Sequence, residues 1–500
     1  MRDPLFLRNV TIYGGGKLIV DKDNTLTTNT LTLRIGGVID GNYDFVYPEF
    51  ILNGTWVNTT DIIHLDYLTT KEQYYTFVAP FEIHTKDIHY PIDIYGNNVT
   101  AENRGSFEFQ YYDGAARATG ATGWKVVEED ATNGATLCAG QGYTFLGMPK
   151  KVNGTRQTFG IHRIPMKVSA DEAMKHESEQ QSVPLSVHLT DKNNYSGWNL
   201  IGNPYMATIT GLTNEDIQVG KLVHTYDANG NWTGGWHWDE ETIQENQRFL
   251  VIPSNDGLSY EAVQTSNAQL PAFKNFFVQI SNKEANALLI PNETRIKPSL
   301  APSRREKELT KRDIEVAIVL EQDAAHTDQL DLLLNNAYTT EFDNNADFTK
   351  MMNATNLNLY GVHTYDNLSF VALDRHSAQQ SISIGYQVPA EGEYLLRMSG
   401  KPYVMLDQIE AIYITDHEMS PKVTVDILAE PYIFHINQAE TNHTRFTMSI
   451  KLKADDTTDY QNITIEHQKP CKFIYQGQLY IMHDHYIFNA TGQLVSIMKE

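Results

Sequence analysis

Short stretches in which apolar and polar residues alternate, separated by Gly, Asn, Asp and Pro, run through nearly the whole chain. Alternation with a period of two places the apolar side chains on one face of an extended strand. Charged residues make up only 20% of the chain, while Asn, Thr, Tyr and Gly are abundant, and this composition favours strands and turns over amphipathic helices. The sequence therefore predicts an all-β protein.

The 500 residues exceed what one hydrophobic core usually holds, so we expect several domains. The first stretch has the shortest strands and the most frequent turns, which favours the last rungs of a β-solenoid or a β-rich cap. Two longer groups of strands predict two β-sandwich, jelly-roll-like modules, and the basic, proline-containing stretch between them predicts a linker. The expected boundaries are 1–70 for the rungs or cap, 71–296 for the first sandwich, 297–312 for the linker, 313–455 for the second sandwich and 456–500 for a C-terminal hairpin and anchoring segment.

The stretch 197–205, GWNLIGNPY, has two glycines and an Asn-Pro pair that a ligand loop could use. A phosphate-binding loop needs converging backbone amides ahead of a helix, and commonly a Lys, and neither is present. Trp198 and Leu200 share one face of an extended chain, and Asn203-Pro204 ends it. We therefore predict a strand followed by a turn.

Charge and cysteine content narrow the function classes. The chain has 39 Lys and Arg against 62 Asp and Glu, and its net charge of −23 repels nucleic acid and anionic lipid. Cys138 and Cys471 cannot form a disulfide framework, and they either pair or, as we expect, remain two free buried thiols. The first residues, MRDPLFLRNVTIYGGG, contain neither an apolar h-region nor a small-residue cleavage site, and no run of about eighteen apolar residues predicts a transmembrane segment. If the protein is exported, we expect Met1 to mark a fragment boundary.

Several phrases, taken in order, resemble a recurrent β module of large secreted and surface proteins of Bacteroidota: YYDGAARATGATGWK (111–125), CAGQGYTF (138–145), GWNLIGNPY and LPAFKNFFVQI (270–280). Residues 330–450 resemble its usual companion, with EFDNNADFTKM, LYGVHTYDNLSFVAL, AEGEYLLRM and RFTMSI. The tail, GQLYIMHDHYIFNATGQLV, resembles the terminal β segments of proteins exported by the type IX secretion system, although it is short. The resemblance implies an extracellular, multi-module, all-β protein whose enzymatic or adhesive part, if there is one, lies upstream.

One stretch combines the start of a helix with the start of a metal motif. SADEAMKHESEQQ (169–181) is either a helix capped by Ser169 or a loop, because its apolar face is thin. Within it, HESEQ begins like the helix of a zinc protease, but Gln180 stands where the second His would have to ligate. We predict no catalytic zinc here.

Two further motifs lack the ligands that a metal needs. His483 and His485 share one strand face, but no third ligand is evident, so a surface strand is the better interpretation. YDANGNW, from Tyr226, has the first oxygen spacing of a calcium loop, but it lacks the turn glycine and the bidentate Glu, and a hairpin turn explains the same residues. We expect no metal, no cofactor and no catalytic residue.

The stretch 231–241, NWTGGWHWDEE, has the residues of a binding site. Trp236 and Trp238 lie on the same face of a strand, Trp232 lies on the same stretch, and acidic residues follow from Asp239. Flat aromatic rings beside carboxylates could stack on sugar rings and bind their hydroxyls, so these four residues are the candidate carbohydrate site. The interpretation that we favour is that the tryptophans are core residues, because aromatic side chains pack well across strands, and Trp236→Ala should then cost about 3–5 kcal/mol.

The function that we expect is that of a non-catalytic, structural or adhesin-like protein, extracellular or on the bacterial cell surface, and the C-terminal part of a larger exported chain. The alternative is a carbohydrate-binding or glycan-degrading protein that uses the tryptophan stretch and nearby carboxylates. The expected partners are a surface glycan or protein and, through the tail, the secretion or outer-membrane anchoring machinery. We expect no nucleic-acid partner.

Overall fold

The computed structural model is all-β, with about 54% of the residues in strands and about 7% in helices, which confirms the predicted fold class. Contacts divide the chain into two compact units, residues 1–452 and 453–500. Within the larger unit we name residues 5–295 the first lobe and residues 314–452 the second lobe. The structure describes residues 5–39, 42–69, 73–88, 106–130, 134–148, 151–152, 155–156, 160–191, 193–242, 244–254, 259–293, 295, 314–324, 326–343, 346–364, 366–375, 377–379, 381–399, 408–453, 471–475, 478–483, 486–489 and 494–497.

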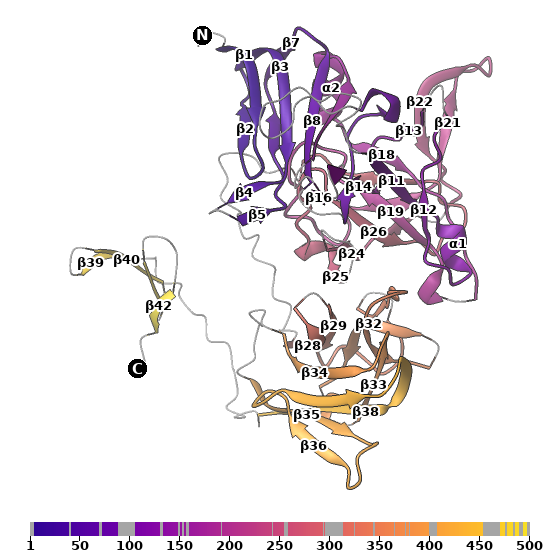
Figure 1. Cartoon of the computed structure of the whole chain (residues 1–500), viewed down its shortest axis with the longest axis vertical. Helices are drawn as coiled ribbons and strands as arrows, with labels where there is room; N and C mark the ends of the chain where they lie inside the picture. The colour runs from indigo at the N-terminus through magenta and orange to yellow at the C-terminus, as the bar shows by residue number, and fades with distance from the viewer. Residues whose placement is uncertain are drawn as a thin grey trace. The chain divides into compact units, whose positions relative to one another are not determined.

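The strands nearest the N-terminus pair mostly in parallel (Figure 1). In the ladder between β3 and β8, Leu31 faces Ile63 and Leu33 faces Leu65, and all four side chains are fully buried. Parallel pairing of successive passes of the chain is the hydrogen-bond pattern that stacked rungs need. The strands are β1 (Leu5–Ile12), β2 (Lys17–Val20), β3 (Thr25–Ile35), β4 (Gly37–Ile39), β5 (Asn42–Asp44), β6 (Glu49–Leu52), β7 (Thr55–Asn58) and β8 (Ile62–Thr69), and β8 also pairs antiparallel with β17 (Gly160–Lys167).

A single core joins these strands to the next part of the first lobe. It extends along the chain from Ile12 to Phe273, so the expected boundary at residue 70 falls inside it. Its centre is aromatic: the rings of Tyr67 and Phe145 lie 4.7 Å apart, and those of Phe77 and Phe109 lie 5.0 Å apart. The added strands are β9 (Tyr74–Phe77), β10 (Ile83–His84), β11 (Ser106–Tyr112), β12 (Trp124–Val126), β13 (Thr136–Leu137), β14 (Tyr143–Met148), β15 (Lys151–Val152) and β16 (Thr155–Arg156), with helices η1 (Thr85–Asp87) and α1 (Gly114–Ala118).

Of the two alternatives for 169–181, the structure contains the helix, as α2 (Ala170–Ser178). Ser169 caps it through a capping box: the Ser169 hydroxyl accepts a hydrogen bond from the Glu172 amide at 3.1 Å, and the Glu172 carboxylate accepts one from the Ser169 amide at 3.0 Å. The side of α2 that carries Ala173 is buried. This resolves the choice between helix and loop in favour of the helix.

Two four-stranded sheets complete the first lobe around a second core that includes Leu250 and Phe276. The sheets follow the orders β18-β27-β20-β23 and β19-β26-β24-β25. Their strands are β18 (Gln181–Pro184), β19 (Trp198–Gly202), β20 (Gln218–Gly220), β23 (Glu245–Asn246), β24 (Phe249–Pro253), β25 (Tyr260–Gln264), β26 (Asn275–Gln279) and β27 (Ala287–Ile290), with helices η2 (Asn193–Tyr195) and η3 (Thr265–Asn267).

The stretch GWNLIGNPY is structural, as predicted, and forms β19 with all five of its residues buried. A Cβ built on Gly202 would come within 1.7 Å of Val78 Cγ2, so only glycine fits there. Beyond the strand, Asn203 Nδ2 donates hydrogen bonds to the carbonyls of Ala207 and Leu270, both at 2.9 Å. The glycine and the asparagine therefore serve close packing and the turn.

The second lobe consists of one 11-stranded sheet around a hydrophobic core that includes Leu332 and Ile412. Other buried residues of the sheet, Leu333, Phe370 and Ala372, form a separate cluster with Phe249 of the first lobe. Pairing is antiparallel except between β29 and β32, and the order is β36-β35-β38-β33-β31-β32-β29-β28-β34-β37, with β30 paired to β32. The elements are β28 (Ile314–Asp323), β29 (His326–Leu334), β30 (Phe348–Thr349), β31 (Asn358–Val362), β32 (Asn367–Leu373), η4 (Ser377–Gln379), β33 (Ile382–Val388), β34 (Gly392–Met398), β35 (Ile409–Asp416), β36 (Val423–Asp426), β37 (Tyr432–Ile436) and β38 (Glu440–Leu452).

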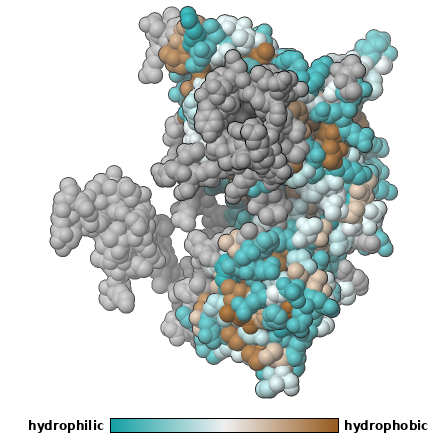
Figure 2. All heavy atoms as spheres, viewed as in Figure 1, coloured by the Kyte–Doolittle hydropathy of each residue, from teal (hydrophilic) through white to brown (hydrophobic). Residues whose placement is uncertain are grey.

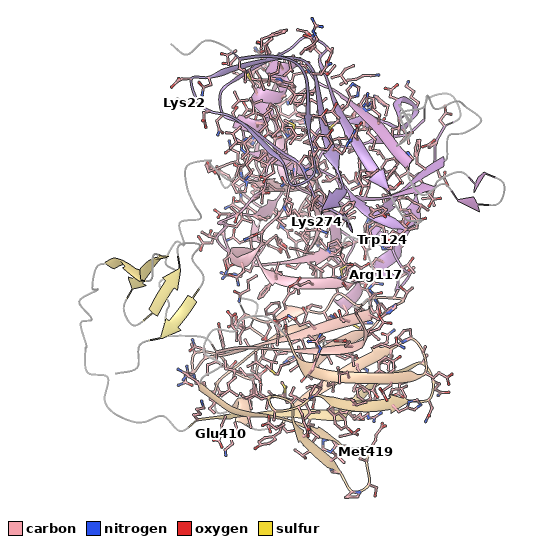
Figure 3. The ribbon with its side chains drawn as sticks, turned by 60° about the vertical axis from the view of Figure 1, so that its left-hand side comes forward. Lys22, Arg117, Trp124, Lys274, Glu410 and Met419 are labelled. Atoms are coloured by element: carbon pink, nitrogen blue, oxygen red, sulfur yellow. The ribbon has the colours of Figure 1, made fainter. Side chains whose placement is uncertain are left out.

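Polar and aromatic contacts join the two lobes. Asn194 Nδ2 donates hydrogen bonds to two main-chain carbonyls of the second lobe, those of Lys350 at 2.9 Å and Asn367 at 2.8 Å. The Phe249 ring stacks on Phe348 with centroids 4.9 Å apart. Arg117, which Figure 3 labels close to Trp124, donates a hydrogen bond to the Met352 carbonyl. These contacts fix the second lobe in one position on the first lobe. We refer to the three hydrogen bonds that Asn194 and Arg117 donate across the lobes as the lobe joint.

The smaller unit contains a four-stranded antiparallel sheet in which consecutive strands pair. The residues between these strands, Gly477 and Gly492 among them, lie outside the described residues. The strands are β39 (Cys471–Tyr475), β40 (Gln478–His483), β41 (Tyr486–Asn489) and β42 (Leu494–Ile497).

Candidate functional site

The tryptophan stretch forms the second strand of a two-stranded hairpin, β21 (Leu222–Tyr226) and β22 (Trp232–Trp238), which projects from the first lobe at the upper right of Figure 1. In its antiparallel register, His224 lies opposite Trp236 and Tyr226 lies opposite Trp232. Residues directly opposite each other share a face. The hairpin thus gathers four aromatic rings on one side, and we call these residues, His224, Tyr226, Trp232 and Trp236, the aromatic face.

The rings of the aromatic face are in contact and largely exposed. His224 lies 4.8 Å from Trp232 and 4.0 Å from Trp236, measured between ring centroids. The exposed fractions are 58% for Tyr226, 53% for Trp232 and 54% for Trp236. The prediction that the tryptophans are core residues is therefore wrong for Trp232 and Trp236, because the hairpin extends beyond the layers that could have covered them.

The third tryptophan, Trp238, has a different role. It lies opposite Leu222 at the base of the hairpin and is only partly exposed. A Cβ built on Gly220 would come within 2.7 Å of Trp238 Cζ3, so the indole packs directly on the β20 backbone. Trp238 therefore anchors the hairpin to the first lobe, and of the three candidate tryptophans only Trp232 and Trp236 are exposed.

The carboxylates of the hairpin are occupied by the turns that they stabilise. Asp239 forms an ion pair with Lys221 at 3.4 Å and accepts the Glu241 amide at 3.1 Å, and the Glu241 amide and the ion pair lower the pKa of Asp239 although burial opposes the shift. At the tip, Asp227 accepts the amides of Asn229 at 2.8 Å and Asn231 at 2.9 Å. Asp239 was expected beside the tryptophans as a ligand for hydroxyls, but its bonds are to the base of the hairpin.

The tip confirms the hairpin-turn interpretation of YDANGNW. Gly230 adopts a left-handed conformation with φ of 81°, and the Asp227 amide donates a hydrogen bond to the Asn231 carbonyl at 2.9 Å. The Asp227 carboxylate and the Asn231 carbonyl, whose oxygen atoms could have bound a calcium ion, thus accept hydrogen bonds within the turn. Among the described residues, no group of three or more His, Cys, Asp or Glu side chains is arranged to hold a metal ion.

The other sequence motifs serve packing. His176 Nε2 lies 2.6 Å from the Pro204 carbonyl, and the buried Glu177 forms an ion pair with Arg295 at 2.7 Å. His485 of the HDH motif lies outside the described residues. Cys138 is free but exposed, so the expectation of a buried thiol is wrong for this residue.

A separate cavity of about 220 Å³ lies in the second lobe, lined by hydroxyl groups such as that of Ser383, by His363 and by Asp347, over an apolar floor. Both oxygens of Asp347 already accept backbone amides, from Ala372 at 2.6 Å and from Asp343 at 2.8 Å. That carboxylate therefore holds the loop in place.

Sequence reasoning found two of the four residues of the aromatic face and missed His224 and Tyr226. Their signal was present: LVHTY alternates, and the Asn-Gly turn that follows sets its pairing with the tryptophan strand. On the side of the molecule that Figure 2 shows, the described residues are mostly hydrophilic, with separate brown patches. The aromatic face is recognised by the exposure of its rings. A scan against family models and a search of curated proteins both find no match to the chain.

Within the described ranges, no helix is both long and apolar enough to cross a bilayer.

Proposed function

We propose that the chain is a non-catalytic, adhesin-like protein of the cell surface or extracellular space that contacts a carbohydrate through its aromatic face. One observation carries the proposal: Trp232, Trp236 and Tyr226 each expose more than half of their surface on one side of a projecting hairpin. Burying such rings would be favourable, and their exposure as a group marks an interaction surface.

Carbohydrate is the partner that suits flat, uncharged rings. The C–H groups on one face of a sugar ring stack on an indole, and the hydroxyl groups at its rim remain in contact with water and with polar neighbours. Such neighbours are the Tyr226 hydroxyl and His224 Nδ1, which lie 3.3 Å apart. The aromatic face thus offers flat rings for the C–H groups of a sugar and polar atoms for its hydroxyl groups.

Binding without cleavage is the favoured activity. A glycosidase places two carboxyl groups on either side of the bond that breaks. In the described hairpin, Asp227 and Asp239 are bound by the two turns, at opposite ends of the aromatic face. The glycan-degrading alternative therefore has no support at this site.

The location and the modular organisation belong to the same proposal. The resemblance to secreted and surface proteins of Bacteroidota supports an extracellular location, with the parallel ladders of β1 to β8 as the end of a solenoid and the two groups of antiparallel sheets as sandwich modules. The sheet β39–β42 would then be recognised by the type IX secretion machinery. Deleting 456–500 and expressing the full gene in its native host tests this, because undiminished surface display would exclude a sorting role.

The binding proposal is tested on a glycan array with the full chain and with Trp232→Ala and Trp236→Ala. We expect the parent to bind a subset of glycans and both variants to lose that binding. Phe6→Ala is the matched control, because Phe6 is an exposed ring, at 60%, on a different sheet. Equal binding by the parent and both tryptophan variants would refute the site.

A further inference from the structure

The two exposed indoles of the aromatic face are not coplanar. The ring planes of Trp232 and Trp236 meet at 76°, with their centroids 6.2 Å apart. The His224 ring lies between them, inclined by 30° to Trp232 and by 66° to Trp236. The surface is therefore a corner, with one wall made by Trp232 and the other by Trp236.

One hydrogen bond and an irregular backbone hold the two indoles at this angle. Trp232 Nε1 donates to the Gly235 carbonyl at 3.0 Å, which fixes the indole across its own strand. Gly234 has a φ of 84°, a conformation that a residue with a side chain rarely adopts, and the ladder is irregular between His224 and Tyr226. The irregular strand twists the two tryptophans away from a common plane.

The corner has a consequence for the shape of the ligand. A flat polysaccharide surface can lie on several rings only when those rings share one plane. Two rings at 76° cannot both lie flat on such a surface, but they can contact the face and the edge of one sugar in a free chain. The geometry thus selects a single chain over a crystalline face.

The charges around the corner also affect which glycans can bind. Between residues 221 and 241 the sequence has four acidic residues and one base, Lys221, and that lysine is paired with Asp239. The whole chain carries −23. Like charges repel, so uronate-rich or sulfated glycans are disfavoured.

We infer that the aromatic face binds neutral glycans presented as single, soluble chains and rejects both crystalline polysaccharides and polyanionic glycans. This inference rests on the proposed function, because it assumes that the ligand is a carbohydrate. It adds to the proposed function the class of carbohydrate that binds. That class follows from the angle between the two indole rings and from the negative charge of the hairpin.

The test compares three probes with the same full-length protein: a panel of soluble neutral hexasaccharides by titration calorimetry, crystalline cellulose and chitin by pull-down, and heparin at low and high salt. We expect binding to at least one neutral hexasaccharide, weakened roughly tenfold or more in Trp232→Ala, Trp236→Ala and Tyr226→Ala but unchanged in Phe6→Ala. Circular dichroism of each variant checks that it is folded.

The outcomes separate the inference from the proposed function. Pull-down by crystalline polysaccharide without binding of soluble chains would overturn the inference on shape and leave carbohydrate binding intact. Heparin binding that weakens with salt and requires Trp232 would overturn the inference on charge. No binding of any probe would overturn both the inference and the proposed function.

Discussion

A buried histidine should make the first lobe sensitive to mildly acidic pH. His162 lies in β17, is 1% exposed, and packs against Phe145 with ring centroids 5.1 Å apart. Burial lowers the pKa of His162 from 6.5 to about 3, because the charged imidazolium would lose its hydration. The unfolded chain therefore binds this proton more readily than the folded one, and the stability from a neutral His162 is complete above pH 6.5 and is lost as pH falls towards 3.

The size of the effect follows from the two pKa values. At pH 5, an unfolded pKa of 6.5 and a folded pKa of about 3 correspond to a loss of about 2 kcal/mol in the free energy of unfolding relative to pH 8. Urea denaturation of the full chain at pH 8, 6.5 and 5 measures this loss. His162→Leu should lower stability at pH 8 but should remove about 2 kcal/mol of the pH dependence.

The comparison isolates His162, because every other titrating group remains in both proteins. Identical pH dependence in the parent and in His162→Leu would refute the reasoning. A parent whose stability does not change between pH 8 and pH 5 would refute it as well.

Three further changes test the packing. Trp236→Ala should cost less than about 1 kcal/mol in urea denaturation, not the 3–5 kcal/mol of a core residue, because the ring is exposed and loses only cross-strand contacts. Lys350→Met should cost about 3–5 kcal/mol by the same measurement, since it leaves the buried Asp328 carboxylate, now 2.6 Å from Lys350 Nζ, without its ion pair, and an unchanged midpoint would contradict this. Gly202→Ala should lower the melting temperature measured by calorimetry, because its Cβ would overlap Val78, whereas Gly37→Ala, with open space around it and no positive φ, should lower it less.

The sequence was most informative where a local rule decides the structure. Alternation places Leu31 and Leu33 on one face of β3, and the spacing from Ser169 to Glu172 is that of a capping box. Alternation also placed Trp236 and Trp238 on one face, but it could not show whether another layer covers that face. Whether a strand face is covered depends on chain segments distant in sequence, and here only Trp238, at the base, is packed against one of them.

Contacts between distant residues left no periodic signal. The hydrogen bonds of Asn194 to the second lobe span more than 150 positions and use an amide that could equally have been at a turn. The role of Asp239 was misjudged for a related reason: an acidic residue beside tryptophans suggests a ligand, but the neighbouring Lys221 and the Glu241 amide are nearer partners.

The lobe joint has a consequence for how this chain tolerates mutation. All three of its hydrogen bonds end on main-chain carbonyls, those of Lys350, Met352 and Asn367, which every amino acid possesses. Replacing the side chains on the receiving side leaves these acceptors in place, whereas replacing Asn194 or Arg117 removes the donors. At Asn367, whose carbonyl is the acceptor, substitutions should therefore be tolerated, so that a library of random variants selected for a rigid chain would be depleted at 194 and 117 and varied at 367.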